Sequence, residues 1–531
     1  MNVSHFNPSA GQGKHLFPWL SLAVIVIVIP LTAVKPQPDG LIPLELLNAL
    51  VAALVFVQGI FVIRTMWRLE KGMDAMPPLA ACYFALQHTA FGFGGLLMSL
   101  SNQHYSYEND QGVFRFSECM LPLMFAHCLC MNAGLLGVWA AARGAAANGS
   151  SGPSSIRFRS DPWTWSVTRG ACMVSLAIHM ATFPILAVPI ERWGAMSYPV
   201  FAIGPCVSAA FFLWGLSWPT CAKKSLFIAY MSCFVVAELI QGQRGNFVTA
   251  FVLFGLGRFV SHGGLRLKAS VLLRWAPVIA VLFWGFVKAE DVRGEFSRGT
   301  PENSAEALSR LDSLTGASPT DAGGKNLDAD GVSMNAVFRV AARLFENSAV
   351  DVISRTPSDI PFWGWTDADW DDLLTGLLPL KLNGDASFLK DENAGVLFLR
   401  SYGWSNIDPS KGNAMPATLL ADSWRRFGWI GVAAFFFVWA WVLTRTTAFL
   451  RSRPGLFTIV FAAALLPNTA FLYGQDVVGV ASSALRRVML SALYAMGVTA
   501  LARTLWPGEG RRAVIGSARA DLVTLPLKAE T

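Results

Sequence analysis

Arginines at the ends of apolar segments are the residues of this sequence best suited to bind an anion. Arg244 lies in a short Gly-bounded turn, Gln241-Gly-Gln-Arg244-Gly245, between two apolar runs. A planar guanidinium presents several donors that match the oxygens of a phosphate or diphosphate. We therefore predict a site for an anionic lipid headgroup, formed by residues at four separate places in the chain: Arg244, Arg293, Arg425 and the pair Arg486 and Arg487. The alternative interpretation is that these arginines only snorkel to a membrane surface and pair with acidic groups.

Carboxylates are the candidates for a general base, because the chain has no histidine after His262. Asp422 is the first candidate, followed by Asp385, Asp391 and Glu392. Asp422 also has a structural interpretation, since it stands one helical turn before Arg425 and Arg426 and could pair with either.

Three tryptophans, Trp363, Trp365 and Trp370, are the candidates for sugar binding. Their rings could stack on sugar faces, or they could form the aromatic belt that is common at a membrane edge; the sequence slightly favours the belt. No metal site or cofactor is predicted. Asn326-x-Asp328-x-Asp330-Gly331 resembles the start of a calcium loop, but Val337 stands where the bidentate Glu would fall. We therefore predict activity that is independent of metal and persists in excess EDTA.

The composition identifies the elements that must position these residues. Of the 531 residues, 53% are hydrophobic and 15% are charged, against about 25% charged in soluble proteins. This excludes a soluble enzyme, a disordered chain and a nucleic-acid binder. Apolar runs of roughly 20 residues predict an all-α polytopic membrane protein. We expect twelve spans, near residues 16–34, 41–63, 78–100, 119–142, 169–189, 198–218, 225–240, 246–263, 275–289, 428–444, 456–474 and 480–503.

The distribution of charge predicts the orientation of these spans. Every even-numbered connection is basic, such as the second, with Arg64, Arg68 and Lys71, and so is the tail 504–531. Basic connections stay in the cytoplasm. We therefore expect both termini in the cytoplasm and the odd-numbered connections, with the candidate site, on the outer side.

One long outer connection divides the chain into a nine-span part at 1–289, a loop at 290–427 and a three-span part at 428–503. The loop has a net charge of −8, which leaves +15 on the rest of a chain whose total is +7. Residues 299–333 are rich in Gly, Ser, Ala and Asp and predict a flexible segment. Residues 334–348 have apolar positions at helical spacing, and we expect such amphipathic helices to lie on the outer membrane surface.

Two stretches resemble one known family. The first is Gln243-Arg244-Gly245 at the start of a span. The second is Asn413-Ala-Met-Pro-Ala-Thr-Leu-Leu-Ala-Asp422-Ser-Trp-Arg-Arg-Phe427-Gly428-Trp-Ile-Gly431 at the end of the long loop. Both are similar to the O-antigen or exopolysaccharide repeat-unit polymerases of the Wzy type. Residues 343–357, Gly364 and residues 377–381 are less specifically similar. The likeness covers about residues 235–500, and Asp422 stands where that family would have Glu.

The resemblance implies a GT-C-like glycosyltransferase of the bacterial inner membrane. Its substrates would be undecaprenyl-diphosphate-linked oligosaccharides on the periplasmic face, joined by inverting transfer with the lipid diphosphate as the leaving group. A polysaccharide co-polymerase that regulates chain length would be a partner. The arginines would then stabilise the leaving diphosphate and a carboxylate would accept the proton of the attacking hydroxyl.

Three other functions compete with this prediction. An O-antigen ligase shares the topology and the leaving group, but in that relative a loop histidine takes part, and the long loop here has none. A flippase or other transporter of lipid-linked oligosaccharides would bind the same anion without chemistry. Transporters commonly show internal repeats of spans, and no clear repeat is present here. A non-catalytic scaffold for envelope assembly is the third alternative.

Overall fold

The computed structural model describes several long stretches of the chain and shorter ones between them. The described residues are 44–70, 77–101, 106–109, 112–147, 162–186, 204–218, 224–240, 244–261, 280, 284–285, 304–315, 353, 362, 364–365, 367, 369–370, 373, 418–452, 455–470 and 476–505.

Helices account for nearly all of the described residues. They are α2 (Leu44–Leu69), α3 (Leu79–His88), η3 (Thr89–Phe93), α4 (Gly94–Ser101), α5 (Phe116–Ala147), α6 (Pro162–Leu186), α8 (Ala209–Ser217), α9 (Lys224–Ile240), α10 (Arg244–Ser261), α12 (Ser304–Thr315), α17 (Leu419–Ser452), α18 (Leu456–Ala470) and α19 (Val477–Leu505). Two short strands, β1 (Ser106–Asn109) and β2 (Gly112–Arg115), pair antiparallel, with Ser106 opposite Arg115. This hairpin leads directly into α5.

Four of the described helices are long and apolar enough to cross a membrane: Leu44–Leu69, Met120–Arg143, Leu419–Arg451 and Val477–Leu505. At 1.5 Å per residue the 26 residues of α2 span about 39 Å, more than the roughly 30 Å of a bilayer core. Large apolar side chains lie exposed along α2 at intervals of three or four residues: Leu46, Leu50, Leu54, Val57 and Phe61. Such a stripe requires an apolar environment. The chain is therefore a helical membrane protein.

The predicted spans coincide with described helices except at 16–34, which lies outside the described residues, and at 275–289, of which only three positions are described. The span expected at 78–100 consists of α3, η3 and α4 in succession, because a π-helical turn at Thr89–Phe93 interrupts the regular helix. The described residues contain four helices that are long and apolar enough to cross a membrane, and the total of twelve crossings stays a prediction.

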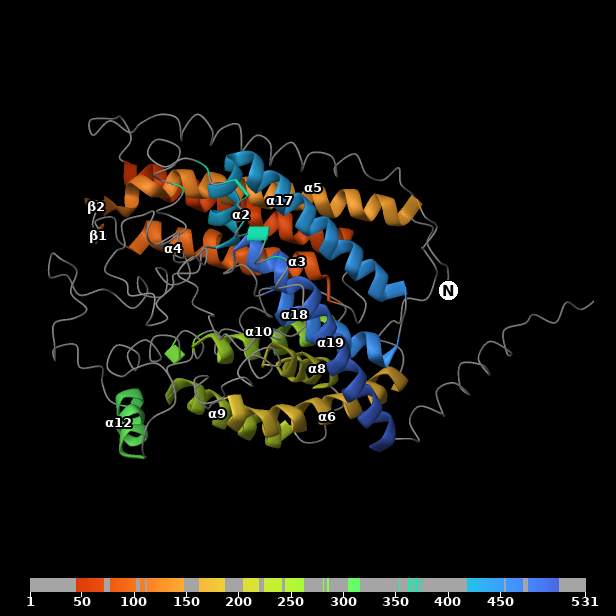
Figure 1. Ribbon diagram of the computed structural model, residues 1–531. Helices are drawn as coiled ribbons and strands as arrows, with labels where there is room; N and C mark the ends of the chain where they lie inside the picture. Colours follow the sequence, from red (N-terminus) through yellow and green to blue (C-terminus); the bar gives the residue numbers. More distant parts are fainter. Residues whose placement is uncertain are drawn as a thin grey trace, which may run out of the picture.

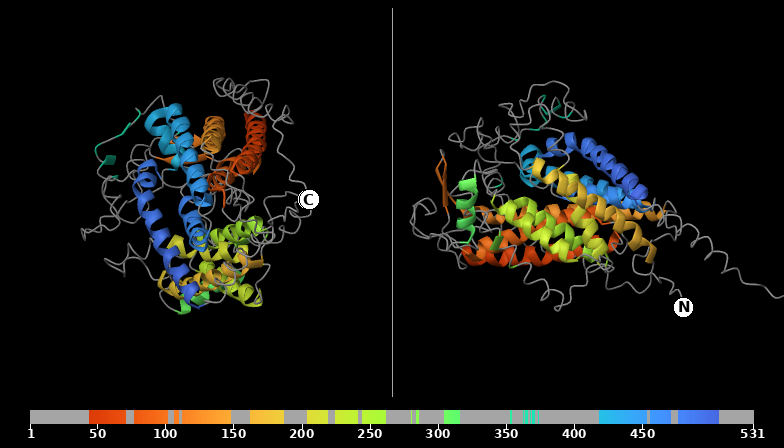
Figure 2. Two further views of the ribbon diagram at one scale, coloured as in Figure 1. Left: turned by 90° about the vertical axis from the view of Figure 1, so that its right-hand side faces the viewer. Right: turned by 90° about the horizontal axis from the view of Figure 1, so that it is seen from below.

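The helices form two groups that α18 and α19 connect (Figure 1). In one group α2, α3 and α17 pack against α5; in the other α6 and α10 pack against α8. α18 contacts α3 of the first group and α8 of the second, while α19 contacts α6. The left view in Figure 2 shows the same division.

Glycines allow the closest contacts within each group. A Cβ on Gly137 of α5 would lie 2.2 Å from the carbonyl oxygen of Phe437 in α17. A Cβ on Gly215 of α8 would lie 2.1 Å from the carbonyl oxygen of Phe254 in α10. Small residues at such contacts let helix backbones approach closely, which is how apolar helices gain packing energy in a membrane.

The hairpin and α12 lie at the same end of the molecule, at the left of Figure 1, and α17 and α19 run away from that end. We call it the hairpin end. α12 lies within the stretch 299–333, where Ser304–Thr315 is helical; the flexibility of that stretch stays a prediction. Its Arg310 is 1% exposed, is paired with Glu306, and donates from Nη1 to the carbonyl oxygen of Ile240 at 3.0 Å. That carbonyl is at the C-terminus of α9, where a cation is favourable. The amphipathic helix expected at 334–348 lies outside the described residues.

Candidate functional site

The site begins with a break in α17. Phe427 (φ −138°, ψ 16°) and Gly428 (φ 62°, ψ −149°) leave helical geometry and separate a short helix at 419–426 from the long helix that follows. The φ of Gly428 lies in a region that L side chains rarely adopt. Gly431 is also constrained, because a Cβ there would lie 2.3 Å from the carbonyl oxygen of Ser423. The Phe-Gly-x-x-Gly sequence therefore folds the short helix against the start of the long one.

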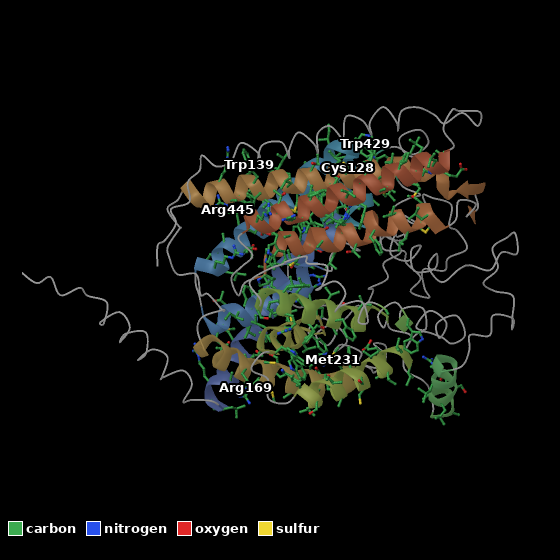
Figure 3. All side chains as sticks on the ribbon, turned by 180° about the vertical axis from the view of Figure 1, so that it is seen from behind. Cys128, Trp139, Arg169, Met231, Trp429 and Arg445 are labelled. Carbon is green, nitrogen blue, oxygen red and sulfur yellow. The ribbon has the colours of Figure 1, made fainter. Side chains whose placement is uncertain are left out.

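The long part of α17 runs from this break to the opposite side of the molecule. Figure 3 labels Trp429 near its start and Arg445 towards its far end. The Arg445 guanidinium lies 5.5 Å from the ring centre of Trp441. On the neighbouring α5, Arg143 lies 3.8 Å over the ring of Trp139. Tryptophan paired with arginine at one level of two adjacent helices is typical of a membrane interface.

The short helix carries an ion-pair network that joins three sequence-distant segments. Arg426 donates from Nε to Oδ2 of Asp422 at 2.9 Å. Its two Nη groups donate to both carboxylate oxygens of Asp369 at 2.6 and 3.0 Å, a bidentate pair. The backbone N–H of Val477, the first residue of α19, donates to the same Oδ2 of Asp422 at 2.8 Å. Asp422 is 0% exposed and Arg426 2%, so the network fixes the loop, α17 and α19 together.

The pairing of Asp422 confirms the structural interpretation of this residue, with Arg426 as the partner. Its other oxygen, Oδ1, is buried and accepts no hydrogen bond within the described part of the chain. Whether Asp422 is the base stays a prediction. Arg425, the adjacent arginine, is 0% exposed.

The segment around Gly364 completes the network from the loop side. The N–H of Gly364 donates to the carbonyl oxygen of Arg426, and Nη1 of Arg426 donates to the carbonyl oxygen of Gly364, both at 3.2 Å. Gly364 has φ +65°, which favours glycine at this turn. Trp365 lies 5.5 Å from the Arg426 guanidinium and edge-on to Trp370. Trp365 therefore packs on the network, whereas Trp370 is 53% exposed and is accessible to a sugar or a lipid.

Asp476 is a member of this site that the sequence did not indicate. It immediately precedes α19, and its Oδ1 accepts a hydrogen bond from the N–H of Gly479 at 2.5 Å. Burial and then the neighbouring Asp422 carboxylate raise the pKa of Asp476 to about 6, against the opposing effect of the Gly479 N–H and Arg426. An Asp directly before an apolar run is a common helix N-cap, and that signal could have located it.

Arg486 and Arg487 lie further along α19. Arg487 donates from Nε to Ser483 at 2.8 Å and from Nη1 to the carbonyl oxygen of Asn468 at 3.3 Å. Asn468 is in the last turn of α18, so Arg487 faces the interior and caps that helix end. Ten residues separate Arg487 from Val477, about 15 Å along the helix. An arginine at that depth in an apolar helix is costly, and such residues are commonly functional.

The structure does not test every predicted site residue. Arg244 begins α10, but its side chain is outside the described residues, as are Arg293, Asp385, Asp391, Glu392 and Trp363. The calcium-like turn at 326–331 is outside them too. Among the described residues no group of three or more His, Cys, Asp or Glu could hold a metal ion. Among the described residues, the structure brings Asp422, Arg426, Asp369 and Asp476 together at one place.

Comparison with known proteins adds no relative: no family model, curated protein or solved structure matches the chain.

Proposed function

We propose that this protein is a glycosyltransferase of the bacterial inner membrane that polymerises oligosaccharide repeat units linked to undecaprenyl diphosphate. The observation that supports it best is the junction where a loop segment, the short helix of α17 and the start of α19 meet through buried charged groups. Charged groups are costly inside a membrane protein, and a buried network of this kind is a default candidate for function. The loop motif that resembles the polymerases forms its centre.

The reaction needs charge of both signs close together. A hydroxyl of the acceptor sugar attacks the anomeric carbon of the donor, the bond from that carbon to the diphosphate breaks, and its electron pair stays on the diphosphate. Arg487 and Arg486 on α19, together with Arg425, Arg244 and Arg293, would stabilise that anion. Fixed cations are most effective for this in a site with little water. The periplasm is the proposed location of the hairpin end.

The proposal predicts a ladder of products. The purified protein in detergent would be incubated with lipid-linked repeat units extracted from a strain that lacks it. Arg487→Gln keeps hydrogen-bond donors for Ser483 and Asn468 but removes the charge, whereas Arg503→Gln changes an exposed arginine near the end of α19. We expect ladders from the wild type and Arg503→Gln, and a rate lower by about 100- to 1,000-fold for Arg487→Gln.

Other results would change the assignment. Wild-type rates from a folded Arg487→Gln protein would retain the enzyme class and remove Arg487 from the diphosphate site. If the wild type binds the substrate but makes no ladder, the polymerase proposal fails. The same preparation would then be supplied with lipid A core as an acceptor, to detect a ligase, or placed in proteoliposomes, to detect a flippase.

A further inference from the structure

Asp422 and Asp476 are two carboxylates in one site with different surroundings. Oδ2 of Asp422 accepts hydrogen bonds from Arg426 Nε and from the N–H of Val477. Asp476 precedes Val477 directly, so the two acidic residues are held together by the same backbone contact. The part of the chain that the structure describes gives Asp476 one N–H partner, Gly479, and none to its Oδ2 from another residue. Asp422 thus accepts hydrogen bonds from two other described residues, and Asp476 accepts one.

A second observation indicates that a donor binds here. Oδ1 of Asp422 is fully buried, yet no described residue donates to it. A buried carboxylate oxygen without a donor is costly, and such an atom in a native structure requires an explanation. A hydroxyl group of a bound sugar would supply the missing donor. The buried arginine pair and the exposed Trp370 ring belong to the same junction, so a sugar hydroxyl is the chemistry that this site fits.

We infer that Asp476 is the catalytic base that takes the proton from the attacking hydroxyl of the acceptor sugar, while Asp422 beside it receives a hydrogen bond from the same sugar. The inference rests on the proposed function. As the new C–O bond forms at the anomeric carbon, the hydroxyl proton passes to Oδ2 of Asp476. The bond from the anomeric carbon to the diphosphate breaks, and its electron pair stays on the diphosphate. Solvent later removes the proton from Asp476.

The local charges agree with this division of roles. The groups that face Asp476 are Asp422 and Arg426 from the short helix and the N–H of Gly479 on its own helix, and Asp369 neutralises the far side of Arg426. Two carboxylates with different surroundings in one site form a common acid–base arrangement. Gly479 also provides space, because a Cβ there would lie 3.2 Å from Oδ1 of Asp476.

Asp476→Asn is the decisive variant, because Asn is also a good N-cap and keeps an oxygen for the Gly479 N–H. Asp367→Asn is the matched control, because Asp367 is an exposed carboxylate outside the ion-pair network. Two measurements would be made on the full-length protein. The first is the rate of polymerisation of lipid-linked repeat units against pH. The second, without substrate, is the infrared difference spectrum between about pH 5 and about pH 8, in which a protonated carboxyl group has its own band.

We expect the wild-type rate to increase with pH through about 6, and Asp476→Asn to lower it by about 100- to 10,000-fold without a decrease in melting temperature. The carboxyl band should disappear in Asp476→Asn and persist in Asp367→Asn. A wild-type rate and pH profile in Asp476→Asn would overturn the inference. If the wild type itself makes no product, the proposed function fails and the spectrum decides alone: a band unaffected by Asp476→Asn rejects Asp476 as the proton-exchanging group, and its loss supports that role for whatever reaction the site performs.

Discussion

Asp422 accepts a hydrogen bond from Arg426, one turn later on the same short helix, and another from the N–H of Val477, 55 residues further along the chain. One carboxylate oxygen thereby connects the end of the long loop to the first turn of the last helix. Because the guanidinium also binds Asp369, movement of the loop would disturb the start of α19. The loop segment at Asp369 and the start of α19 are therefore connected through two side chains, Arg426 and Asp422.

Removing the cation should destabilise the whole junction. Arg426→Met leaves two carboxylates without their partner, and breaking a buried pair in this way costs about 3–5 kcal/mol. The free energy of unfolding in a detergent titration would measure the loss. Arg503→Met removes an exposed arginine and should change it by less than about 0.5 kcal/mol. Equal effects of the two substitutions would contradict the network described here.

A glycine should be required at position 428 for full stability, because the backbone there has a positive φ. Gly428→Ala forces a side chain into a positive-φ conformation at a cost of about 1–3 kcal/mol, and its Cβ would lie 3.1 Å from the Phe362 ring. Gly497→Ala is the matched control, because that helical glycine has open space around it and alanine should stabilise α19 by up to about 1 kcal/mol. Thermal unfolding of both variants checks this, and a stabilised Gly428→Ala protein would refute it.

His88 and Gly92 should be energetically coupled. The ring of His88 is hydrogen-bonded to His127 at 3.0 Å, and a Cβ on Gly92 would lie 2.2 Å from that ring. Gly92→Ala should therefore destabilise the protein by about 1–3 kcal/mol. In the His88→Ala background the same change should cost much less, since the ring is gone. A double-mutant cycle of unfolding free energies measures the difference, and additive effects would show that the ring and the glycine do not compete for space.

Stability should depend on pH through Asp476. Its pKa is raised in the folded protein from an ordinary 3.8 to about 6, so between these values the folded state holds more protons than the unfolded state. Stability from this group is therefore full below about pH 4 and is lost as the pH rises to about 6, by at most about 3 kcal/mol. Melting temperatures across this range should fall for the wild type and change less for Asp476→Asn. A steeper fall of the melting temperature in Asp476→Asn would show that Asp476 is not the group that lowers stability as the pH rises.

The two ends of the bundle should face opposite sides of the membrane. Asp367→Cys, in the loop segment of the site, should react with a membrane-impermeant maleimide added to spheroplasts. Arg503→Cys, near the end of α19, should react only after the membrane is opened. Cys233, the exposed cysteine among those described, would first be changed to serine. Reaction of both positions from the same side would reject the predicted orientation.

The sequence by itself determined that this is a helical membrane protein and where most of its helices lie. Apolar runs have to form helices in lipid, because every backbone polar group must be satisfied within the segment. The span expected from residue 428 accordingly coincides with the long helix that follows the break at Gly428. Helices α9 and α10 also lie close to their predicted positions. Composition did not indicate helix α12 or the tertiary contact between Arg310 and the end of α9.

Only the tertiary structure decided which charged residues belong together. Arg425 and Arg426 are adjacent and chemically identical, yet Arg426 is the one that binds Asp422 and Asp369, because the direction of a side chain depends on the turn of the helix and on the segments that pack around it. Asp476 had no distinguishing motif beyond a helix N-cap. Its unusual proton affinity comes from burial beside Asp422, a residue 54 positions away that reaches it only after folding.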